Sequence, residues 1–167
     1  TNTTLRSALS SYNSLTSTQK QSSDISAWNV VEVTDMSGLF ENNATFNADI
    51  GGWEVQNVTN MENMFKNASL FNQDISAWNT GSATSMASMF EGASAFNKDI
   101  SSWDTLDVTN MSSMFKGDSS FNHPIMWDVT NVTTMESMFE GASSFNGDIS
   151  DYLSLIHISE PTRHTDI

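Results

Sequence analysis

A repeat of about 25 residues runs through most of this chain and constrains its fold more than any other feature. One copy, from Val58 to Trp78, reads VTNMENMFKNASLFNQDISAW. Its closing aromatic residue recurs every 25 residues, with one interval of 24, at Trp28, Trp53, Trp78, Trp103, Trp127 and Tyr152. A fixed period of about 20 to 50 residues is typical of stacked repeats, which bury their apolar faces only against each other. We therefore expect an elongated stack with one continuous core.

The first part of each copy predicts a short helix. Thr59 stands before a Met-x-x-Met-Phe run with Glu62 three residues later, and Thr133 and Glu136 repeat this pair. Such pairs are typical of a capping box that opens a helix. Two residues after the phenylalanine, only Asn or Gly occurs, as expected of a left-handed residue that ends a helix. These residues are Asn42, Asn67, Gly92, Gly117 and Gly141.

The second part of each copy, Phe-Asn-x-Asp-Ile-Ser-x-Trp, is too short and too polar for a helix. Alternation would point the isoleucine inward and the flanking Asp and Ser outward, which predicts a short strand. The expected fold is therefore an α/β repeat solenoid, a leucine-rich-repeat-like right-handed coil stack with one short parallel strand and one short helix per coil. One copy is a residue short, and Pro124 in it predicts a local break in strand pairing.

Three segments follow from this pattern. Residues 1–23 break the period, and Leu5, Ala8, Leu9 and Tyr12 have the spacing of an amphipathic helix, with Thr3 or Thr4 as its N-cap. We expect this segment to be an N-terminal helical cap on the stack. Residues 24–152 form a solenoid of about six coils, and residues 153–167 form a tail of doubtful origin.

The tail reads LSLIHISEPTR from Leu153 to Arg163, which resembles the translation of a transposase library adapter. This interpretation predicts that the natural chain continues beyond Tyr152 with other residues. The alternative is a genuine C-terminal strand, because its apolar residues are Leu153, Leu155, Ile156 and Ile158. The chain also begins at Thr1 without an initiator Met, which fits a secreted product that has lost its signal peptide, although trimming of the expressed chain would look the same.

Composition excludes several functions. Six basic against twenty acidic residues give a formal charge of −14, which repels nucleic acid and anionic lipid. The chain has no cysteine, so disulfides, thiol catalysis and thiolate metal sites are excluded. No apolar run approaches the ~18 to 20 residues of a membrane span. We expect no cofactor, no nucleic-acid partner and no membrane insertion.

Polar residues recur at fixed positions as well. An aspartate column (Asp24, Asp49, Asp74, Asp99 and Asp148) has two interpretations, a calcium-binding or cationic-surface-binding ladder and a solvated row that keeps one face soluble. An asparagine column (Asn47, Asn72, Asn97, Asn122 and Asn146) predicts a ladder of side-chain amides that satisfy backbone groups of the neighbouring coil. The Trp and Met columns are expected in the core rather than as a sugar-stacking platform, and His123 as an ordinary surface residue.

Six asparagines lie in Asn-x-Ser/Thr acceptor sites for N-glycosylation and are expected in surface turns. They are Asn2, Asn43, Asn57, Asn67, Asn110 and Asn131. The alternative is that a repeat rich in Asn, Ser and Thr generates such sites by composition alone. No nucleophile with a neighbouring base, no metal-spaced His cluster and no phosphate-binding loop is found, so we expect no enzyme.

From about Asp24 to Tyr152 the chain resembles the BspA-like bacterial surface-protein repeat of about 26 residues. The resemblance lies in Val-Thr-x-Met-x-x-Met-Phe, a turn of small residues, and Phe-Asn-x-Asp-Ile-Ser-x-Trp, with Leu5, Ala8 and Tyr12 similar to the cap helix of such arrays. It implies a secreted or cell-surface protein used in adhesion or as a structural repeat, without established catalysis.

The expected function is therefore a non-enzymatic extracellular structural or adhesion protein, glycan-decorated in a glycosylating host and able to assemble end to end into fibrils. Its partners would be further copies of itself, or glycans and proteins of a cell surface or matrix. The alternative is an adhesin module that binds calcium or glycans through the outward Asp and Ser side chains.

Overall fold

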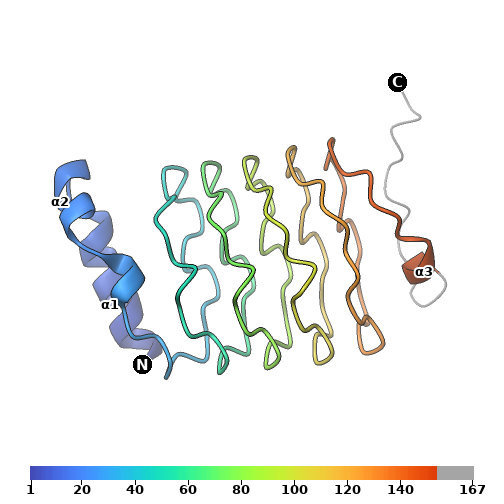
Figure 1. Ribbon diagram of the computed structural model, residues 1–167, viewed down its shortest axis with the longest axis horizontal. Coiled ribbons are helices and arrows are strands. Elements are labelled where there is room, and N and C mark those ends of the chain that lie inside the picture. Colours follow the sequence, from blue (N-terminus) through green and yellow to red (C-terminus); the bar gives the residue numbers. More distant parts are fainter. Residues whose placement is uncertain (154–167) are drawn as a thin grey trace.

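The helices lie at the two ends of a stack of irregular coils (Figure 1). The computed structural model describes residues 1–153, and in that range the helices are α1 (Asn2–Asn13), α2 (Ser17–Ser22), the 3-10 helix η1 (Ile25–Ala27) and α3 (Ser150–Leu153). Between residues 28 and 149 the described backbone consists of turns, bends and isolated bridges. We name the coils by their closing aromatic residue: coil 1 is 29–53, coil 2 is 54–78, coil 3 is 79–103, coil 4 is 104–127 and coil 5 is 128–152.

Isolated parallel bridges join each coil to the next at one residue per coil. They pair Asp35 with Asn60, Asn60 with Ser85, Ser85 with Asn110, and Asn110 with Thr134. The threonine before each bridge residue adds a side-chain contact: the Thr59 hydroxyl donates to the Thr34 carbonyl at 3.1 Å, and later coils repeat this contact. The predicted capping boxes at Thr59 and Thr133 are therefore wrong, because both hydroxyls bond to the preceding coil.

The expected helix in each coil is also wrong. From Met36 onward, alternate N–H groups donate to the next coil, as Gly38 does to the Glu62 carbonyl at 2.8 Å and Phe40 to the Met64 carbonyl at 2.8 Å. The N–H groups between them close tight turns, as Leu39 does on the Met36 carbonyl at 3.2 Å. An α-helix needs bonds four residues back along the same segment. These donors are divided instead between the coil itself and its neighbour.

Left-handed residues enforce this path. Asn42, Asn67, Gly92, Gly117 and Gly141 have φ between 58° and 72°, as the sequence predicted. A second left-handed position lies four residues earlier, at Gly38, Asn63, Ser88, Ser113 and Ser137, with φ between 54° and 60°. Only glycine adopts this region without cost, and a single such residue interrupts a helix. The second position was not predicted, because serine gives no sign of a left-handed backbone.

The expected strand in each coil is wrong as well, and with it the α/β solenoid. Where the ladder was predicted, side chains connect the coils: the Asn97 N–H donates to the Asn72 side-chain oxygen at 3.0 Å, and the Asn122 N–H to the Asn97 oxygen at 3.0 Å. The ladder of asparagine amides is thereby confirmed from Asn47 to Asn146. Because amide side chains supply the acceptors, the backbones of this segment need not pair as strands.

Phenylalanines form the centre of the core. Two columns run along the stack, and successive rings of the first are stacked at centroid distances of 5.4 to 5.6 Å from Phe40 to Phe139. Within each coil the two phenylalanines also stack, as Phe65 and Phe71 do at 3.9 Å. The repeated methionines and most isoleucines and tryptophans around them are buried, as predicted for these columns, whereas Ile149 and Trp28 at the two ends are partly buried.

The tryptophan column is held by hydrogen bonds to the preceding coil. The indole N–H groups of Trp53, Trp78, Trp103 and Trp127 donate at 3.0 to 3.1 Å to the carbonyls of Ile25, Ile50, Ile75 and Ile100. Tyr152 takes the same place in coil 5, where its hydroxyl donates to the Ile125 carbonyl at 2.8 Å. That hydroxyl also accepts the Trp127 N–H at 2.9 Å, since the copy with Pro124 is too short to close its usual turn.

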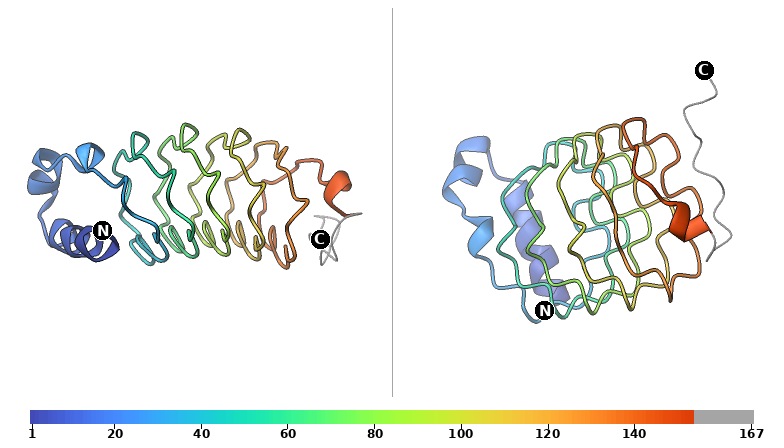
Figure 2. Two further views of the ribbon diagram at one scale, coloured as in Figure 1. Left: turned by 90° about the horizontal axis from the view of Figure 1, so that it is seen from below. Right: turned by 45° about the vertical axis from the view of Figure 1, so that its right-hand side comes forward.

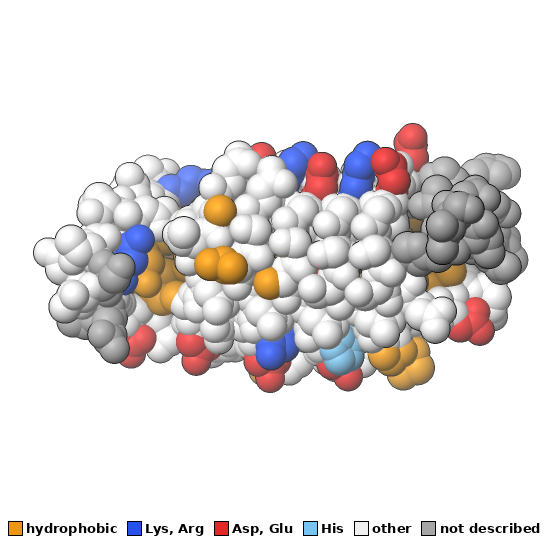
Figure 3. Space-filling model, turned by 90° about the horizontal axis from the view of Figure 1, so that it is seen from above, with side chains coloured by type: hydrophobic (Ala, Val, Ile, Leu, Met, Phe, Trp, Pro, Cys, Tyr) orange, Lys and Arg blue, Asp and Glu red, His pale blue; other side chains and the backbone are white. Residues whose placement is uncertain are grey.

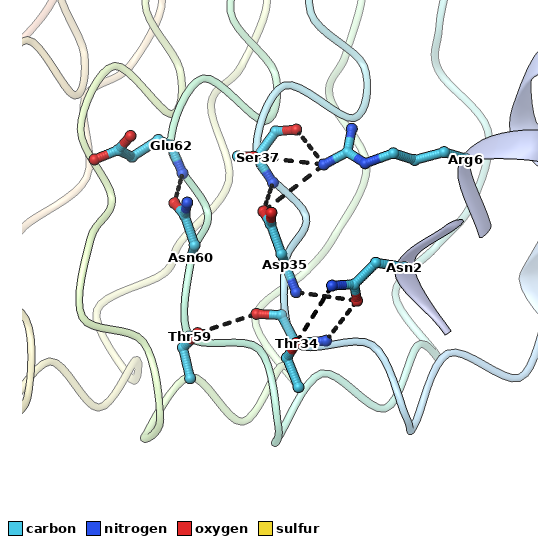
Figure 4. A network of polar contacts seen from close by, with 8 residues as sticks. All are labelled: Asn2, Arg6, Thr34, Asp35, Ser37, Thr59, Asn60 and Glu62. Atoms are coloured by element: carbon cyan, nitrogen blue, oxygen red, sulfur yellow. Dashed lines mark hydrogen bonds and ion pairs between the residues drawn. The ribbon is translucent and has the colours of Figure 1, made fainter. Parts of the chain in front are cut away.

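Helix α1 closes the N-terminal end of the stack (Figure 2). Thr1 is its N-cap, in place of the predicted Thr3 or Thr4, and Leu5, Leu9 and Tyr12 are buried. Figure 4 shows how α1 reaches coil 1: the Asn2 side-chain oxygen accepts the N–H groups of Thr34 and Asp35 at 3.0 and 3.3 Å. Arg6 donates to the Ser37 carbonyl at 2.7 Å. Asn2 therefore replaces the carbonyl, and Arg6 the N–H, that another coil would supply.

Truncation of one core ring tests the phenylalanine column. We expect Phe90→Ala to lower the free energy of unfolding by about 3 to 5 kcal/mol, because a fully buried ring between two neighbours leaves a cavity. Leu70→Ala, at a side chain that is 56% exposed, is the control, with an expected change within about 0.5 kcal/mol. Urea unfolding measures both, and equal losses for the two variants would contradict the assigned core.

The cap is tested by amide hydrogen exchange. We expect Asn2→Ala to speed exchange at Thr34 and Asp35 by an amount equivalent to about 1 kcal/mol, because both amides lose their acceptor. Asn2→Asp keeps that oxygen and should retain most of the protection. The Thr59 amide donates to the Thr34 carbonyl, so it should not change in either variant. Unchanged exchange at Thr34 in Asn2→Ala would show that α1 does not close coil 1.

Candidate functional site

The aspartate column has a local structural role at all five of its positions. One carboxylate oxygen of Asp74 accepts the Ser76 N–H at 3.0 Å, and one of Asp99 accepts the Ser101 N–H at 3.0 Å. Asp24, Asp49 and Asp148 make the same bond to the residue two positions later. One oxygen atom of each carboxylate thus accepts a hydrogen bond within a turn of its own coil.

Between Asp74 and Asp99 the surface is hollowed by about 220 Å³. The hollow is also lined by Ser76, Lys98, Ser101 and Ser102. The backbone N–H and hydroxyl of Ser76 lower the pKa of Asp74, and the charge of Lys98 adds to this effect. Hydrogen bonds from Ser101 likewise lower the pKa of Asp99. We define these six residues as the Asp/Ser hollow, which presents two ionised carboxylates, hydroxyl groups and one ammonium group.

The Asp/Ser hollow is better suited to a hydroxylated ligand than to a metal ion. Lys98 brings a positive charge into the lining of the hollow, which disfavours a bound cation, and calcium prefers six to eight oxygen ligands. In the part of the chain that the structure describes, no three His, Asp or Glu side chains come together in a way that could hold a metal ion. Carboxylates accept hydrogen bonds from sugar hydroxyls, and serine hydroxyls both donate to them and accept from them, without such a cluster.

The six glycosylation candidates differ in exposure and in the use of their amides. Asn57, Asn67 and Asn131 are exposed, and each amide donates one hydrogen bond to the preceding coil at 2.8 to 2.9 Å. The other three, Asn2, Asn43 and Asn110, are partly buried. Asn2 lies in α1 rather than in the expected turn, and Asn43 donates to the Asn13 side-chain oxygen at 3.2 Å. The exposed three are therefore the better acceptors, and their glycosylation stays a prediction.

Charged side chains gather along two edges of a face that is otherwise mostly uncharged (Figure 3). At one repeat position the sign alternates, and neighbouring coils pair there: Lys66 with Glu91 at 2.9 Å and Lys116 with Glu140 at 3.0 Å. Burial opposes ionisation of Glu91, but hydrogen bonds from Lys66 and Ser88 and the charges of both lysines outweigh it, so its pKa is lowered. His123 Nε2 lies 3.2 Å from the Asn97 carbonyl oxygen, to which it can only donate, at the position that Gln73 holds two coils earlier.

Asp118 is a buried carboxyl that sequence reasoning missed. It is 0% exposed and occupies the position that Ala93 and Ala142 hold in the neighbouring coils. One oxygen accepts the N–H groups of Ser120 and Phe121 at 3.0 and 3.2 Å, but the other has no hydrogen-bond partner within residues 1–153. Burial raises the pKa of Asp118 to about 7, although the two N–H groups favour the ionised form. Alignment of the copies against one another would have exposed this single acid in an alanine column.

Asp118 makes stability depend on pH. An unfolded aspartate titrates near pH 3.9, so between about pH 4 and pH 7 the folded chain binds more protons at Asp118 than the unfolded chain. The free energy of unfolding therefore falls as pH rises through this range. We expect Asp118→Ala to be more stable than the native chain at about pH 8 and to lose this pH dependence. Urea unfolding across the range measures both effects.

A partner for the Phe121 N–H remains in that variant. In the alanine copies the corresponding N–H donates to the alanine carbonyl, as Phe96 does to Ala93 at 2.8 Å. Asp107→Ala, at an exposed aspartate of the same coil, is the control and should leave the pH profile unchanged. If Asp118→Ala keeps the native slope between about pH 4 and pH 7, the carboxyl is not buried as described.

Comparisons with known proteins identify the repeat. A family model described as "Mycoplasma protein of unknown function, DUF285" matches residues 7–105 and again residues 75–158. Searches of curated proteins and of solved structures each found no match. No helix among residues 1–153 is long and apolar enough to cross a membrane. Because the two overlapping matches cover most of the 167 residues, the chain belongs to the DUF285 repeat family.

Proposed function

We propose that this chain is a non-enzymatic repeat protein of structural or adhesive function, located outside the cell or at the cell surface. The proposal is supported by membership of a repeat family and by the resemblance of the copies to BspA-like surface repeats. The charge of −14 disfavours nucleic acid and anionic lipid as partners. Glycans or proteins of a cell surface or matrix remain the partners that suit an uncharged polar face.

The repetition of identical polar groups is the observation that carries this proposal. An exposed threonine stands at the same position of each coil, at Thr34, Thr59, Thr84, Thr109 and Thr133, and the side-chain bonds between coils hold this row in register. The hydrogen bonds of the asparagine ladder likewise hold a row of identical side chains in register along the stack. A rigid surface with regularly repeated weak contacts gains avidity by engaging several sites at once.

The titratable groups support the non-enzymatic part of the proposal. Catalytic acids and bases are usually paired in unlike environments that move their pKa values apart. The aspartate column repeats one environment from coil to coil, and Asp118 contacts only backbone N–H groups through its bonded oxygen. Neither arrangement pairs two titratable groups in unlike environments.

Glycan binding in the Asp/Ser hollow is the second candidate function, and in it this hollow would be the site of adhesion. The carboxylates of Asp74 and Asp99 and the serine hydroxyls that line the same hollow offer directional hydrogen bonds to a hydroxylated ligand. Lys98 favours a mode that does not need calcium. A calcium-dependent mode is the weaker form of this candidate, because Lys98 competes for the same carboxylates.

End-to-end assembly into fibrils is a further part of the proposal. In coil 5 the N–H groups of Met135, Phe139 and Gly141 find no acceptor within residues 1–153, although their equivalents in coils 1 to 4 donate to the next coil. In a fibril, coil 1 of a second copy would supply the carbonyl acceptors. Because α1 covers coil 1, this contact requires α1 of that copy to move away from the end of its stack. Fibrils seen by electron microscopy at high concentration support assembly, and monodisperse particles contradict it without affecting adhesion.

Glycosylation would decorate the same surface. The exposed amides of Asn57, Asn67 and Asn131 each donate one hydrogen and keep a second for a glycan. Intact mass of the secreted chain checks this, and a mass equal to that of the bare polypeptide contradicts it.

A glycan array probed with the full chain tests the function. We expect binding to glycans that a chelator does not abolish, with signals reduced at least tenfold in the double variant Asp74→Asn, Asp99→Asn. This loss follows because an amide accepts hydrogen bonds from sugar hydroxyls more weakly than a carboxylate. The double variant Asp104→Asn, Asp107→Asn makes the same charge change at exposed positions elsewhere and should bind like the native chain.

Three results would contradict the proposal in different parts. Loss of binding on chelation would restore the calcium-dependent mode. Equal binding by both double variants would exclude the Asp/Ser hollow while leaving adhesion. Absence of binding to every glycan, together with no binding to matrix proteins, would remove the adhesive function.

A further inference from the structure

Trp28 breaks the pattern of the tryptophan column. The other four indole N–H groups donate to an isoleucine carbonyl of the preceding coil, and their rings are only 3 to 4% exposed. Trp28 is partly buried, with the Tyr12 ring edge-on at a centroid distance of 6.0 Å. No coil precedes it, and its indole N–H has no acceptor among the described residues. The repeat thus leaves one strong donor without its usual partner.

A hollow of about 250 Å³ adjoins this tryptophan, between α1 and the start of coil 1. Figure 2 shows α1 and the segment that carries η1 at this same end of the stack. One wall of the hollow is apolar, and the remaining lining is aromatic or polar. The residues used below are Leu5, Ala8 and Val33 on the apolar side, with Thr4, Trp28 and Asn29.

Asn29 adds a second unused donor. Its side-chain oxygen accepts the Val31 N–H at 3.1 Å, which fixes the amide orientation. The amide nitrogen has no acceptor in the range 1–153. Two residues with unused N–H donors therefore line the hollow beside its apolar wall, which suits a ligand that carries both hydrogen-bond acceptors and a small apolar group.

We propose that this hollow binds the acetamido group of an N-acetylated amino sugar. In the other coils the partner of the indole N–H is a peptide carbonyl, and an acetamido group carries the same amide oxygen. Its methyl group fits against Leu5, Ala8 and Val33, and the C–H face of a sugar ring suits the accessible part of the Trp28 indole. Ring hydroxyls then accept from Asn29 and exchange hydrogen bonds with Thr4.

The size of the hollow favours a single sugar. Drug-sized ligands occupy pockets of roughly 300 to 1,000 Å³, and this hollow is below that range. The inference rests on the proposed function only for glycans as partners, since the hollow shares no residue with the Asp/Ser hollow. The two sites can therefore fail separately.

Nuclear magnetic resonance on the full chain tests the assignment, because five tryptophans give five indole N–H signals. Trp28→Phe identifies the Trp28 signal by its loss. We expect N-acetylglucosamine to shift that signal in a saturable way, with glucose giving at most one tenth of the shift at equal concentration. The buried indole of Trp103 is the internal control and should not move.

Asn29→Ala is the matched binding variant, and it should weaken N-acetylglucosamine at least fivefold at the Trp28 signal. Unfolding curves of both variants report whether the cap still folds. If Trp28→Phe unfolds α1, the Trp28 signal is assigned by elimination, from Trp103→Phe and the corresponding Phe variants of the other three tryptophans.

Each outcome decides the proposal. Equal shifts with glucose overturn the role of the acetamido group, and a stronger response to an N-acetylated amino acid amide than to the sugar assigns the hollow to peptides instead. An unmoved Trp28 signal overturns the site. If the chain still binds the glycan array in that case, the proposed function stands without this hollow.

Discussion

Hydrogen bonds that cross from one coil to the next are the interaction on which the rest of this structure depends. Between residues 28 and 149 the described backbone has no helix or strand that could satisfy its own donors and acceptors. Alternate N–H groups of coils 1 to 4 donate to the next coil, while asparagine and threonine side chains complete the contacts elsewhere. A buried polar group without a partner costs about 1 to 3 kcal/mol, so no coil is stable away from its neighbours. The stacked phenylalanines supply apolar burial, but the hydrogen bonds keep the coils in register.

This dependence makes the ends and the exceptions of the stack chemically distinct. At the N-terminal end Asn2 and Arg6 imitate a missing coil, yet the imitation stops short of Trp28, whose donor is left over. In coil 4, Asp118 replaces an alanine and brings a carboxyl into a core that has no cation for it. Function in a repeat family such as this one is to be sought where the repeat is broken, and on the faces that repetition makes multivalent.

Several features were predictable from the residues because they depend only on the period. The columns of Phe, Met, Ile and Trp had to be buried, since a fixed spacing stacks equal residues on one another. The asparagine ladder and the left-handed residues at Asn42, Asn67 and Gly92 followed in the same way. The helix and the strand did not, because the capping and alternation rules count only neighbours along the chain. Ser88 and Ser113 adopt φ values near 55° in a place where a helix was predicted.

The sequence by itself therefore determined which residues stack, which are buried and where the period fails. The tertiary structure decided to which partner each backbone group bonds. An N–H group can close a turn in its own coil or donate to the next, and these choices cost similar free energy in an isolated segment. Which of the two hydrogen bonds forms depends on whether a neighbouring coil presents a carbonyl within hydrogen-bond distance of that N–H group. The same physical reason hides the unpaired oxygen of Asp118 and the unused indole of Trp28 from the sequence, because both are defined by a partner that the neighbouring segment fails to provide.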